Sequence, residues 1–450
     1  MPKQEKEPKT IIKHTPGGFH VETGLFFEQV EDGKYCMWDI DGNIKLAPSV
    51  TYGTYDGCPI NYFPLEKVAW SLPPVPIPLT DKEQLWKDIR KFIYEHLFLP
   101  DEALYDVVTS WVFASWLPEL WITVPYLFFF GPVASGKTRG LEILQRLAYR
   151  GILSSNISSA ALFRACEQWK PTIILDETEI YSKSERYEVI GLLNSGYRKG
   201  QFAVRVKNSE EGAVLEVFDV FGFKAMAGTQ GLAQALESRS ILIRMIKNRR
   251  AVKLFIDEET AKKLRGQLLM WRMQTLHFSN KTKEGLEKTP ECELCELSEV
   301  KLRDVPPLNV ESGRIQELFQ PLLAVANSGR ESIVKYAEKM DDIRRFEEKA
   351  SVEAELIEII LKSETTLEEN IFLTKNLAEE FNKDRNEREK WKSRSIGRLM
   401  RRLGFEMRHT RMGNGWYIDL ERLRYLKEIY LGGDVAPKIT SQTSHTSPLS

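Results

Sequence analysis

The stretch from Tyr126 to Thr138 limits the possible folds more than any other part of the chain. Its sequence, YLFFFGPVASGKT, joins an apolar run to the pattern G-x-x-x-x-G-K-[ST] of a phosphate-binding loop. Apolar residues then recur at helical spacing from Leu141 to Ala148. The stretch therefore predicts a buried strand, a glycine-rich turn and a helix that begins at the turn.

Each residue type in this loop has a chemical role. Glycines allow backbone N–H groups to surround phosphate oxygens, and the helix that follows points its positive end at the same anion. Lys137 would contact the β- and γ-phosphates, and the Thr138 hydroxyl would ligate Mg²⁺. We expect nucleotide contacts from the whole loop: Gly131, Pro132, Val133, Ala134, Ser135, Gly136, Lys137 and Thr138.

A second apolar run, Thr172 to Leu175, ends in two carboxylates, Asp176 and Glu177. On a strand beside the phosphate-binding loop, Asp176 would lie near Mg²⁺, and Glu177 could orient the water that attacks the γ-phosphate. Alone, this ending is a common strand terminus. Together with the loop it predicts ATP hydrolysis.

The composition fits a globular protein of two or three domains, because 450 residues are 42% hydrophobic. A net charge of -1 excludes a global field that attracts nucleic acid, so such binding needs a local patch. Five irregularly spaced cysteines indicate reduced thiols and a cytoplasmic location. No secretory signal is visible, and the apolar window Trp111 to Phe130 is interrupted by Pro118 and Pro125, which predicts buried elements and no membrane association.

Strands and helices alternate around the loop. Predicted core strands at 126–130, 151–154, 172–175, 224–228 and 241–245 indicate an α/β fold with a parallel, three-layer sheet. A hairpin over 201–218 precedes the fourth of these strands along the chain.

With these motifs, the region from about 80 to 330 resembles an AAA+ P-loop ATPase, of the branch with superfamily III and minichromosome-maintenance-like helicases of plasmids and phages. The resemblance is carried by GPVASGKT, ILDE, the hairpin and LESR at 236–239. It implies a helical lid, and it implies ATP sites shared between the subunits of a hexameric ring.

The resemblance also implies further site residues. Arg239 would reach the neighbouring subunit's γ-phosphate, and Arg314 would start a lid helix and touch the nucleotide. Thr229 or Gln230 would hold the attacking water at the end of the fourth strand. The hairpin, with Arg205 and Lys207 near its tip, would face a DNA channel. A surface ion pair is the alternative for Arg239, and a solvated charge at a helix start is the alternative for Arg314. A structural β-ribbon is the alternative for the hairpin.

The C-terminal part has the outline of a winged helix-turn-helix. Between Trp391 and Arg411 there is one acidic residue, Glu406, among a cluster of basic side chains. Such a cluster suits phosphate contacts with salt-dependent affinity, although a protein-docking face has a similar composition. The basic residues are Lys392, Arg394, Arg398, Arg401, Arg402, Arg408 and Arg411.

Two minor motifs favour ordinary structure. Asp39 and Asp41 resemble the paired aspartates of primases, but a turn beside Gly42 explains them. Cys292 and Cys295 form a single C-x-x-C, which lacks the second ligand pair of a zinc site, so we expect thiols and no zinc.

The domain organisation follows from these segments. We expect a tail (1–12), a β-rich module (13–70), a Pro-rich linker (71–80), an ATPase core with preceding helices (81–250), a helical lid region (251–350), a winged helix (351–431) and a tail (432–450). The predicted function is that of an ATP-hydrolysing DNA helicase or translocase of a mobile genetic element, partnered by DNA, by copies of itself and by a primase or polymerase. The alternative is a nucleotide-switched helicase loader or replication regulator that does not unwind DNA.

Overall fold

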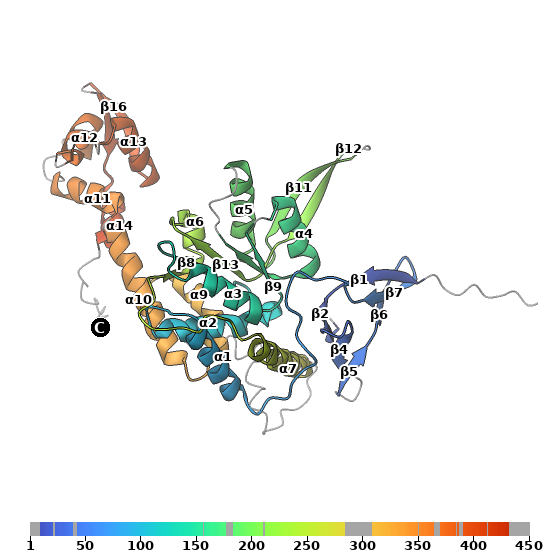
Figure 1. Ribbon diagram of the computed structural model, residues 1–450. Helices are drawn as coiled ribbons and strands as arrows, with labels where there is room; N and C mark the ends of the chain where they lie inside the picture. Colours follow the sequence, from blue (N-terminus) through green and yellow to red (C-terminus); the bar gives the residue numbers. More distant parts are fainter. Residues whose placement is uncertain are drawn as a thin grey trace, which may run out of the picture. The chain divides into compact units, whose positions relative to one another are not determined.

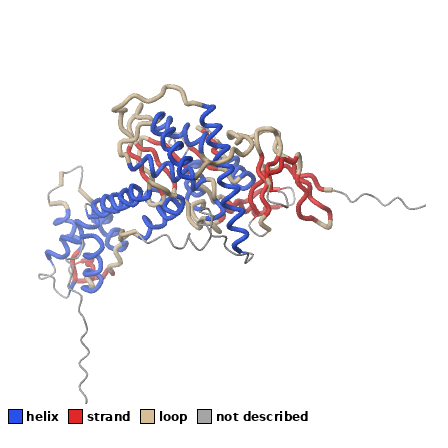
Figure 2. The backbone as a smooth tube through the Cα atoms, turned by 90° about the horizontal axis from the view of Figure 1, so that it is seen from below, coloured by secondary structure: helices blue, strands red, loops and turns tan. Residues whose placement is uncertain are grey.

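The structure is a computed structural model that divides into two compact units, Met1–Glu338 and Lys339–Ser450. Figure 1 labels the elements, and Figure 2 shows the N-terminal module as strands and loops and the remaining chain as a mixture of helices, strands and loops. The structure describes residues 10–20, 23–38, 43–155, 157–176, 183–209, 212–283, 308–349, 351–363, 370–383, 385–386, 390–411 and 413–431.

Two small sheets form the N-terminal module, with strand orders β1-β7-β6 and β2-β3-β4-β5. Asp56 and Gly57 join β6 to β7 with positive φ angles of 52° and 74°, as a two-residue hairpin turn requires. The strands are β1 (Ile11–His14), β2 (Gly17–His20), β3 (Leu25–Gln29), β4 (Tyr35–Trp38), β5 (Ile44–Ala47), β6 (Val50–Tyr55) and β7 (Cys58–Phe63).

A buried ionic cluster fixes this module to the core. Glu28 on β3 accepts hydrogen bonds from Arg150 Nε at 2.9 Å and from the Tyr149 hydroxyl at 2.7 Å. Arg272 contacts the same tyrosine and forms a bidentate pair with Glu119 at 2.6 and 2.8 Å. Although burial would raise the pKa of Glu119, the Arg272 guanidinium holds that pKa below its usual value.

The core sheet has five parallel strands in the order β14-β8-β13-β10-β9. It confirms the expected parallel α/β architecture around the phosphate-binding strand. The strands are β8 (Tyr126–Phe130), β9 (Gly151–Ser154), β10 (Thr172–Leu175), β13 (Lys224–Gly228) and β14 (Ser240–Arg244).

Helices pack around this sheet (Figure 1). Asp81 caps the first of them by accepting a 2.6 Å hydrogen bond from Gln84 N, and α2 is buried along nearly its whole length. The helices of the first unit are α1 (Lys82–His96), α2 (Ala103–Ser115), the 3₁₀ turn η1 (Pro118–Leu120), α3 (Lys137–Leu147), α4 (Ser159–Trp169), α5 (Lys183–Ser195), α6 (Gln234–Glu237), α7 (Glu258–Lys283), α9 (Gly313–Val325) and α10 (Arg330–Lys349), which continues into the second unit.

The apolar window from Trp111 to Phe130 therefore consists of the end of α2, the η1 turn and β8, as expected. Within the part of the chain that the structure describes, no helix combines the length and apolar character needed to cross a membrane.

Two expectations about segment boundaries change. Strand β1 begins at Ile11, inside the segment 1–12 that we expected to be a tail. The Pro-rich segment 71–80, which we expected to be a stiff connector between domains, packs on α7. Ile77 N donates to Gly266 O at 3.1 Å, and a Cβ on that glycine would come within 2.8 Å of the Ile77 side chain.

The hairpin predicted before β13 is present as β11 (Phe202–Ser209) and β12 (Gly212–Asp219). One face packs on α4 through Arg205, whose guanidinium lies 4.3 Å from the centre of the Phe163 ring. The opposite face is apolar and exposed, and it includes Val204 and Val206 with their cross-strand partners Val217 and Leu215.

The second unit has a core of its own beneath a small antiparallel sheet of order β15-β17-β16. Trp416 of β17 is 1% exposed and lies in that core with Ile396, Leu399 and Met400 of α13. The elements of this unit are α11 (Val352–Ser363), β15 (Ile371–Leu373), α12 (Thr374–Phe381), α13 (Ser393–Arg402), β16 (Glu406–Thr410), β17 (Gly413–Tyr417) and α14 (Leu420–Leu431).

Candidate nucleotide site

The phosphate-binding loop runs from the end of β8 to the start of α3. Gly131 is required there, because a Cβ on it would lie 2.4 Å from the carbonyl oxygen of Met245. Gly136 has a φ of 91°, a conformation that favours glycine, and Ala134 also has a positive φ of 60°. The backbone is thereby curled ahead of the α3 N-terminus, which is the geometry of an anion site.

Polar side chains of this loop are poised inside it. Lys137 Nζ donates to the carbonyl oxygens of Gly131 and Pro132, both at 2.8 Å. Ser135 is 1% exposed, and its hydroxyl oxygen has no hydrogen-bond partner among the described residues. An unpaired buried hydroxyl costs stability, so this oxygen marks a place where a ligand oxygen would complete the hydrogen bonding.

The carboxylate and the polar residue expected at the site follow neighbouring strands. Asp176 comes directly after β10, and Thr229 directly after β13. The Asp176 strand does not pair directly with the loop strand, because β13 lies between β8 and β10. Neighbouring strands are about 4.8 Å apart, so Thr229 lies between the loop and Asp176 at the C-terminal ends of these strands. Glu177 falls outside the described residues.

The residues at the C-terminal ends of these strands offer oxygen ligands of the kind that Mg²⁺ takes. Among the described residues, no group of three or more His, Cys, Asp or Glu side chains is placed to hold a metal. Mg²⁺ needs few protein ligands, because it keeps water and binds substrate phosphates. An exposed Thr138 hydroxyl and a half-buried Asp176 are oxygen ligands of the kind it takes. Cys292 and Cys295 lie outside the described residues, as do Asp39 and Asp41.

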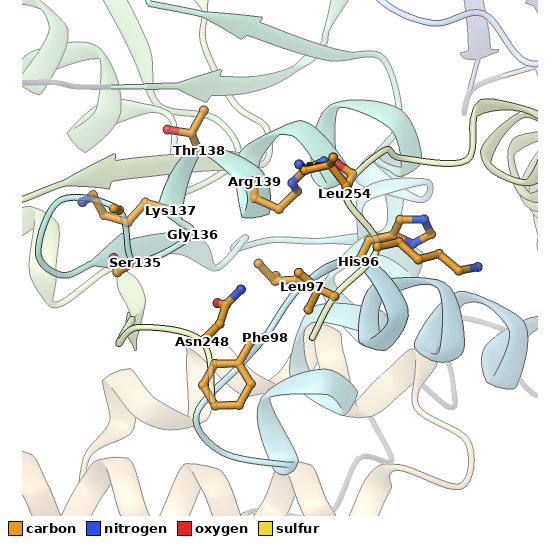
Figure 3. A pocket seen from close by; sticks show the side chains of 13 residues that line it. His96, Leu97, Phe98, Ser135, Gly136, Lys137, Thr138, Arg139, Asn248 and Leu254 are labelled. Carbon is orange, nitrogen blue, oxygen red and sulfur yellow. Dashed lines mark hydrogen bonds between the residues drawn. The ribbon is translucent and has the colours of Figure 1, made fainter. Parts of the chain in front are cut away.

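A pocket of about 410 Å³ extends from the loop (Figure 3). It has three walls: the phosphate-binding loop with the start of α3, the C-terminal end of α1 at His96–Phe98, and the loop that joins β14 to α7. The third wall contributes Asn248 and 252–254. The volume is in the range of small-molecule sites, and it exceeds what phosphates alone would fill.

The β14–α7 loop is fastened to α1 and α3. Arg250 donates to Leu97 O at 2.8 Å and to the Tyr105 hydroxyl at 2.9 Å, and its guanidinium lies 3.8 Å from the centre of the Tyr94 ring. Lys253 pairs with Glu95 at 2.5 Å, and this hydrogen bond lowers the pKa of the Glu95 carboxyl. On the other side, Arg139 Nη2 donates to Leu254 O at 2.7 Å.

Arg239 lies at the opposite, N-terminal ends of the core strands. Its carbonyl oxygen accepts from Tyr126 N at 3.1 Å, where β8 begins, whereas Gly131 follows the other end of that strand. The four residue steps of β8 span about 13 Å. Arg239 is therefore separated from the phosphate-binding loop of its own chain by the length of the sheet.

Arg314 lies near Arg239, in the first turn of α9. The guanidinium of Arg239 is 5.8 Å from the centre of the Tyr197 ring, and that of Arg314 is 5.0 Å from it. Glu317 pairs with Arg314 at 2.5 Å and with Arg198 at 3.7 Å, and it accepts from the Tyr197 hydroxyl at 3.3 Å. Sequence reasoning missed Tyr197 and Glu317, which belong to no motif.

The predicted DNA contacts fall into two groups. In the hairpin, Arg205 is not near the tip. It lies opposite Glu216 in mid-strand and stacks on Phe163, because an arginine of this register points toward α4. Lys207 lies in β11, and its side chain is outside the described ones.

In the second unit, the basic residues predicted to contact DNA are all exposed. They are Lys392, Arg394, Arg398, Arg401, Arg402, Arg408 and Arg411. Those on α13 lie opposite its buried apolar residues, so the helix is strongly amphipathic. Arg402 pairs with Glu353, and Arg408 lies 4.0 Å from the centre of the Tyr417 ring. These contacts leave a basic face on α13.

No known family model matches the chain, and no curated protein does. Solved structures do show similarity, and three of them are described here. A full-length MCM homolog from Methanopyrus kandleri is 11% identical, with a TM-score of 0.33 over 71% of this chain and 72% of that one. JCV helicase is 14% identical, with 0.23 over 58% and 60%. The NrS-1 C-terminal region, CTR, in its A-form apo structure is 12% identical, with 0.34 over 85% and 93%. Likenesses this weak carry no argument about family or function.

Proposed function

We propose that this protein hydrolyses ATP and uses it to move on DNA as a ring of identical subunits. The observation that carries the proposal is the separation of the site into two halves. The phosphate-binding loop, with Thr138 and Asp176, lies at the C-terminal ends of the core strands. Arg239 and Arg314 lie at the N-terminal ends of these strands. A complete site then needs two copies of the chain.

The loop half binds and orients the triphosphate. Its backbone N–H groups and the α3 N-terminus surround the phosphates, and Lys137 exchanges its two carbonyl partners for phosphate oxygens. Thr138 and Asp176 would hold Mg²⁺, which would neutralise charge on the phosphates when bound. Glu177 and Thr229 orient the attacking water. Arg239 of the next copy offsets the charge that develops on the γ-phosphate.

Exposed apolar side chains support such an assembly. Val133 in the phosphate-binding loop is 79% exposed, and Leu254 and Phe255 at the same site are 71% and 81% exposed. Large apolar side chains that cluster at the mouth of a polar site are typical of surfaces covered by a partner. A second copy that brings Arg239 and Arg314 to this site would cover them. We propose a hexameric ring, by the resemblance stated above.

The second unit supplies the DNA contact in this proposal. We infer a winged helix from its helices and its three-stranded sheet, and in this proposal the exposed arginines of α13 contact phosphates. The replication system would be that of a plasmid or phage, with a primase or polymerase as partner and the cytoplasm as location.

A second function is favoured by the hairpin. Its exposed face carries valines and a leucine instead of basic side chains, and Arg205 is stacked on α4. This face suits a protein partner better than a DNA strand. It supports the alternative of a nucleotide-switched loader or replication regulator, in which ATP controls assembly without unwinding.

The test uses the full chain with two variants, Lys137→Ala and Glu177→Gln. We expect both to abolish ATP hydrolysis, with Glu177→Gln still binding ATP, and we expect size-exclusion chromatography with a non-hydrolysable ATP analogue to show a ring. Lys67→Ala, an exposed lysine outside the site, is the control. Full hydrolysis by either variant would overturn the proposal. Strand displacement by the wild type supports the motor, and nucleotide-dependent recruitment of a partner without displacement supports the loader.

A further inference from the structure

The part of the pocket beyond the phosphate-binding loop has the character of a nucleobase site. Near α1 it is lined by Leu97, which is buried, and Phe98, which is half-buried, beside His96, and Val252 lies on the opposite wall. Flat, aromatic ligands are held between such walls by burial of their faces.

Asn248 brings one polar group to these walls (Figure 3). Its carboxamide is exposed and, in the described part of the chain, no hydrogen bond to it is found. A Cβ placed on Gly136 would lie 3.9 Å from Asn248 Oδ1, so the amide lies beside the phosphate-binding loop. A carboxamide offers one acceptor and two donors, which is the complement of a base edge.

The backbone that carries Asn248 is held in place. Two residues further on, Arg250 is bonded to Leu97 O and the Tyr105 hydroxyl, and Lys253 N donates to Glu95 O at 2.9 Å. These bonds tie the Asn248 wall to the Leu97 wall. A binding group on a fixed backbone loses little entropy when the ligand arrives, which increases its selectivity.

We propose that Asn248 selects adenine among the nucleoside triphosphates, a role that rests on the proposed nucleotide site. On the edge that contains N7, adenine presents an acceptor and the N6 amino donor, which a carboxamide pairs with in bidentate fashion. Guanine presents two acceptors on that edge, so one of its contacts with the carboxamide oxygen is repulsive. Pyrimidines are too small to reach both the apolar walls and the amide.

The test measures equilibrium binding of fluorescent ATP and GTP analogues to the full chain, independently of hydrolysis. We expect the wild type to bind the ATP analogue at least about tenfold more tightly than the GTP analogue, in line with one bidentate base contact. Asn248→Ala should bring the two affinities to within about twofold of each other. Lys247→Ala, the exposed neighbouring residue, should leave the ratio as in the wild type.

The outcomes separate this inference from the proposed function. An unchanged affinity ratio in Asn248→Ala, or the absence of a preference in the wild type, would overturn the role of Asn248. The proposed nucleotide site would still stand in that case if Lys137→Ala abolishes nucleotide binding. Absence of nucleotide binding by the wild type would overturn both. We expect the melting temperature of Asn248→Ala without nucleotide to lie within about 1 °C of that of the wild type. Such a result would show that the variant is folded and that only the preference for ATP is lost.

Discussion

Arg239 and Arg314 lie against the same tyrosine, with their guanidinium carbons 5.8 and 5.0 Å from the centre of the Tyr197 ring. Tyr197 itself is 2% exposed, and its ring packs edge-on against Tyr126 at the start of β8. The ring is therefore fixed to the sheet, and it orients both arginines. Two residues that share one support cannot be displaced independently.

The first prediction concerns this shared support. Tyr197→Leu removes the ring, so we expect kcat for ATP to fall at least as far as in Arg239→Ala, with ATP affinity unchanged, since the phosphate-binding loop is at the other edge of the sheet. Tyr197→Phe keeps the ring and loses only the hydroxyl, with its bonds to Glu317 and Arg314, so it should retain most of the activity. Equal loss in the two variants would show that the hydroxyl, and not the ring, is what matters.

The second prediction tests whether the two halves of the site come from different copies. Arg239→Ala alone should lose roughly 10³-fold in hydrolysis, as expected for an arginine that stabilises the transition state. Lys137→Ala alone should be inactive. Mixing the two variants pairs an intact loop with an intact Arg239 at some junctions, so hydrolysis should return to a substantial fraction of the wild-type rate. Mixtures no more active than the separate variants would place both residues in one chain's site or remove Arg239 from it.

The third prediction is a pH dependence of stability from Lys224, a residue at the start of β13 that is 1% exposed. Its ammonium donates to Val220 O and Gly222 O at 2.9 and 2.8 Å, yet burial lowers its pKa to about 8. Below pH 8 the lysine is protonated in both the folded and unfolded states. Between pH 8 and about 10.4, only the unfolded state keeps the proton, so the free energy of unfolding rises with pH, by up to roughly 3 kcal/mol.

Lys224→Met should lack this rise. The measurement is urea unfolding of the wild type and the variant at several pH values from 7 to 10, compared as a difference so that other titrating groups cancel. A constant difference across this range would mean that the three-carbonyl environment keeps Lys224 protonated in the folded state.

The fourth prediction concerns the ionic cluster between the N-terminal module and the core. The side chains of Arg150 and Glu28 are 4% and 3% exposed, so Arg150→Met deprives a buried carboxylate of its nearest cation and should cost about 3–5 kcal/mol of unfolding free energy. Glu28→Gln with Arg150→Met removes both charges and should recover much of that loss. Denaturant unfolding of the single and double variants measures the coupling, and additive effects would contradict it.

Much of the nucleotide site follows from local sequence. The loop, the strand before it, the carboxylate after β10 and the hairpin are each encoded within short stretches of chain, so their patterns are visible without knowledge of the fold. The position of β13 between β8 and β10 was not predictable, because the order of parallel strands depends on helix packing far along the chain. Neither was the Tyr197 cluster, whose members come from separate elements, nor the direction of Arg205, which depends on one residue of register.

The last prediction concerns the basic face of α13. Each phosphate contact releases counterions, so a log–log plot of DNA affinity against salt concentration should have a negative slope, which becomes shallower by about 0.7–0.9 for each lost contact. Arg394→Ala and Arg398→Ala remove exposed guanidiniums and should each have this effect. Arg402→Ala is the matched control, because that arginine is already paired with Glu353 and should change the slope less. The measurement is a filter-binding titration from low to moderate salt. If the wild type binds DNA with no salt dependence, or if all three variants keep its slope, α13 contacts a protein and not DNA, and the nucleotide site would then drive docking instead of movement along a strand.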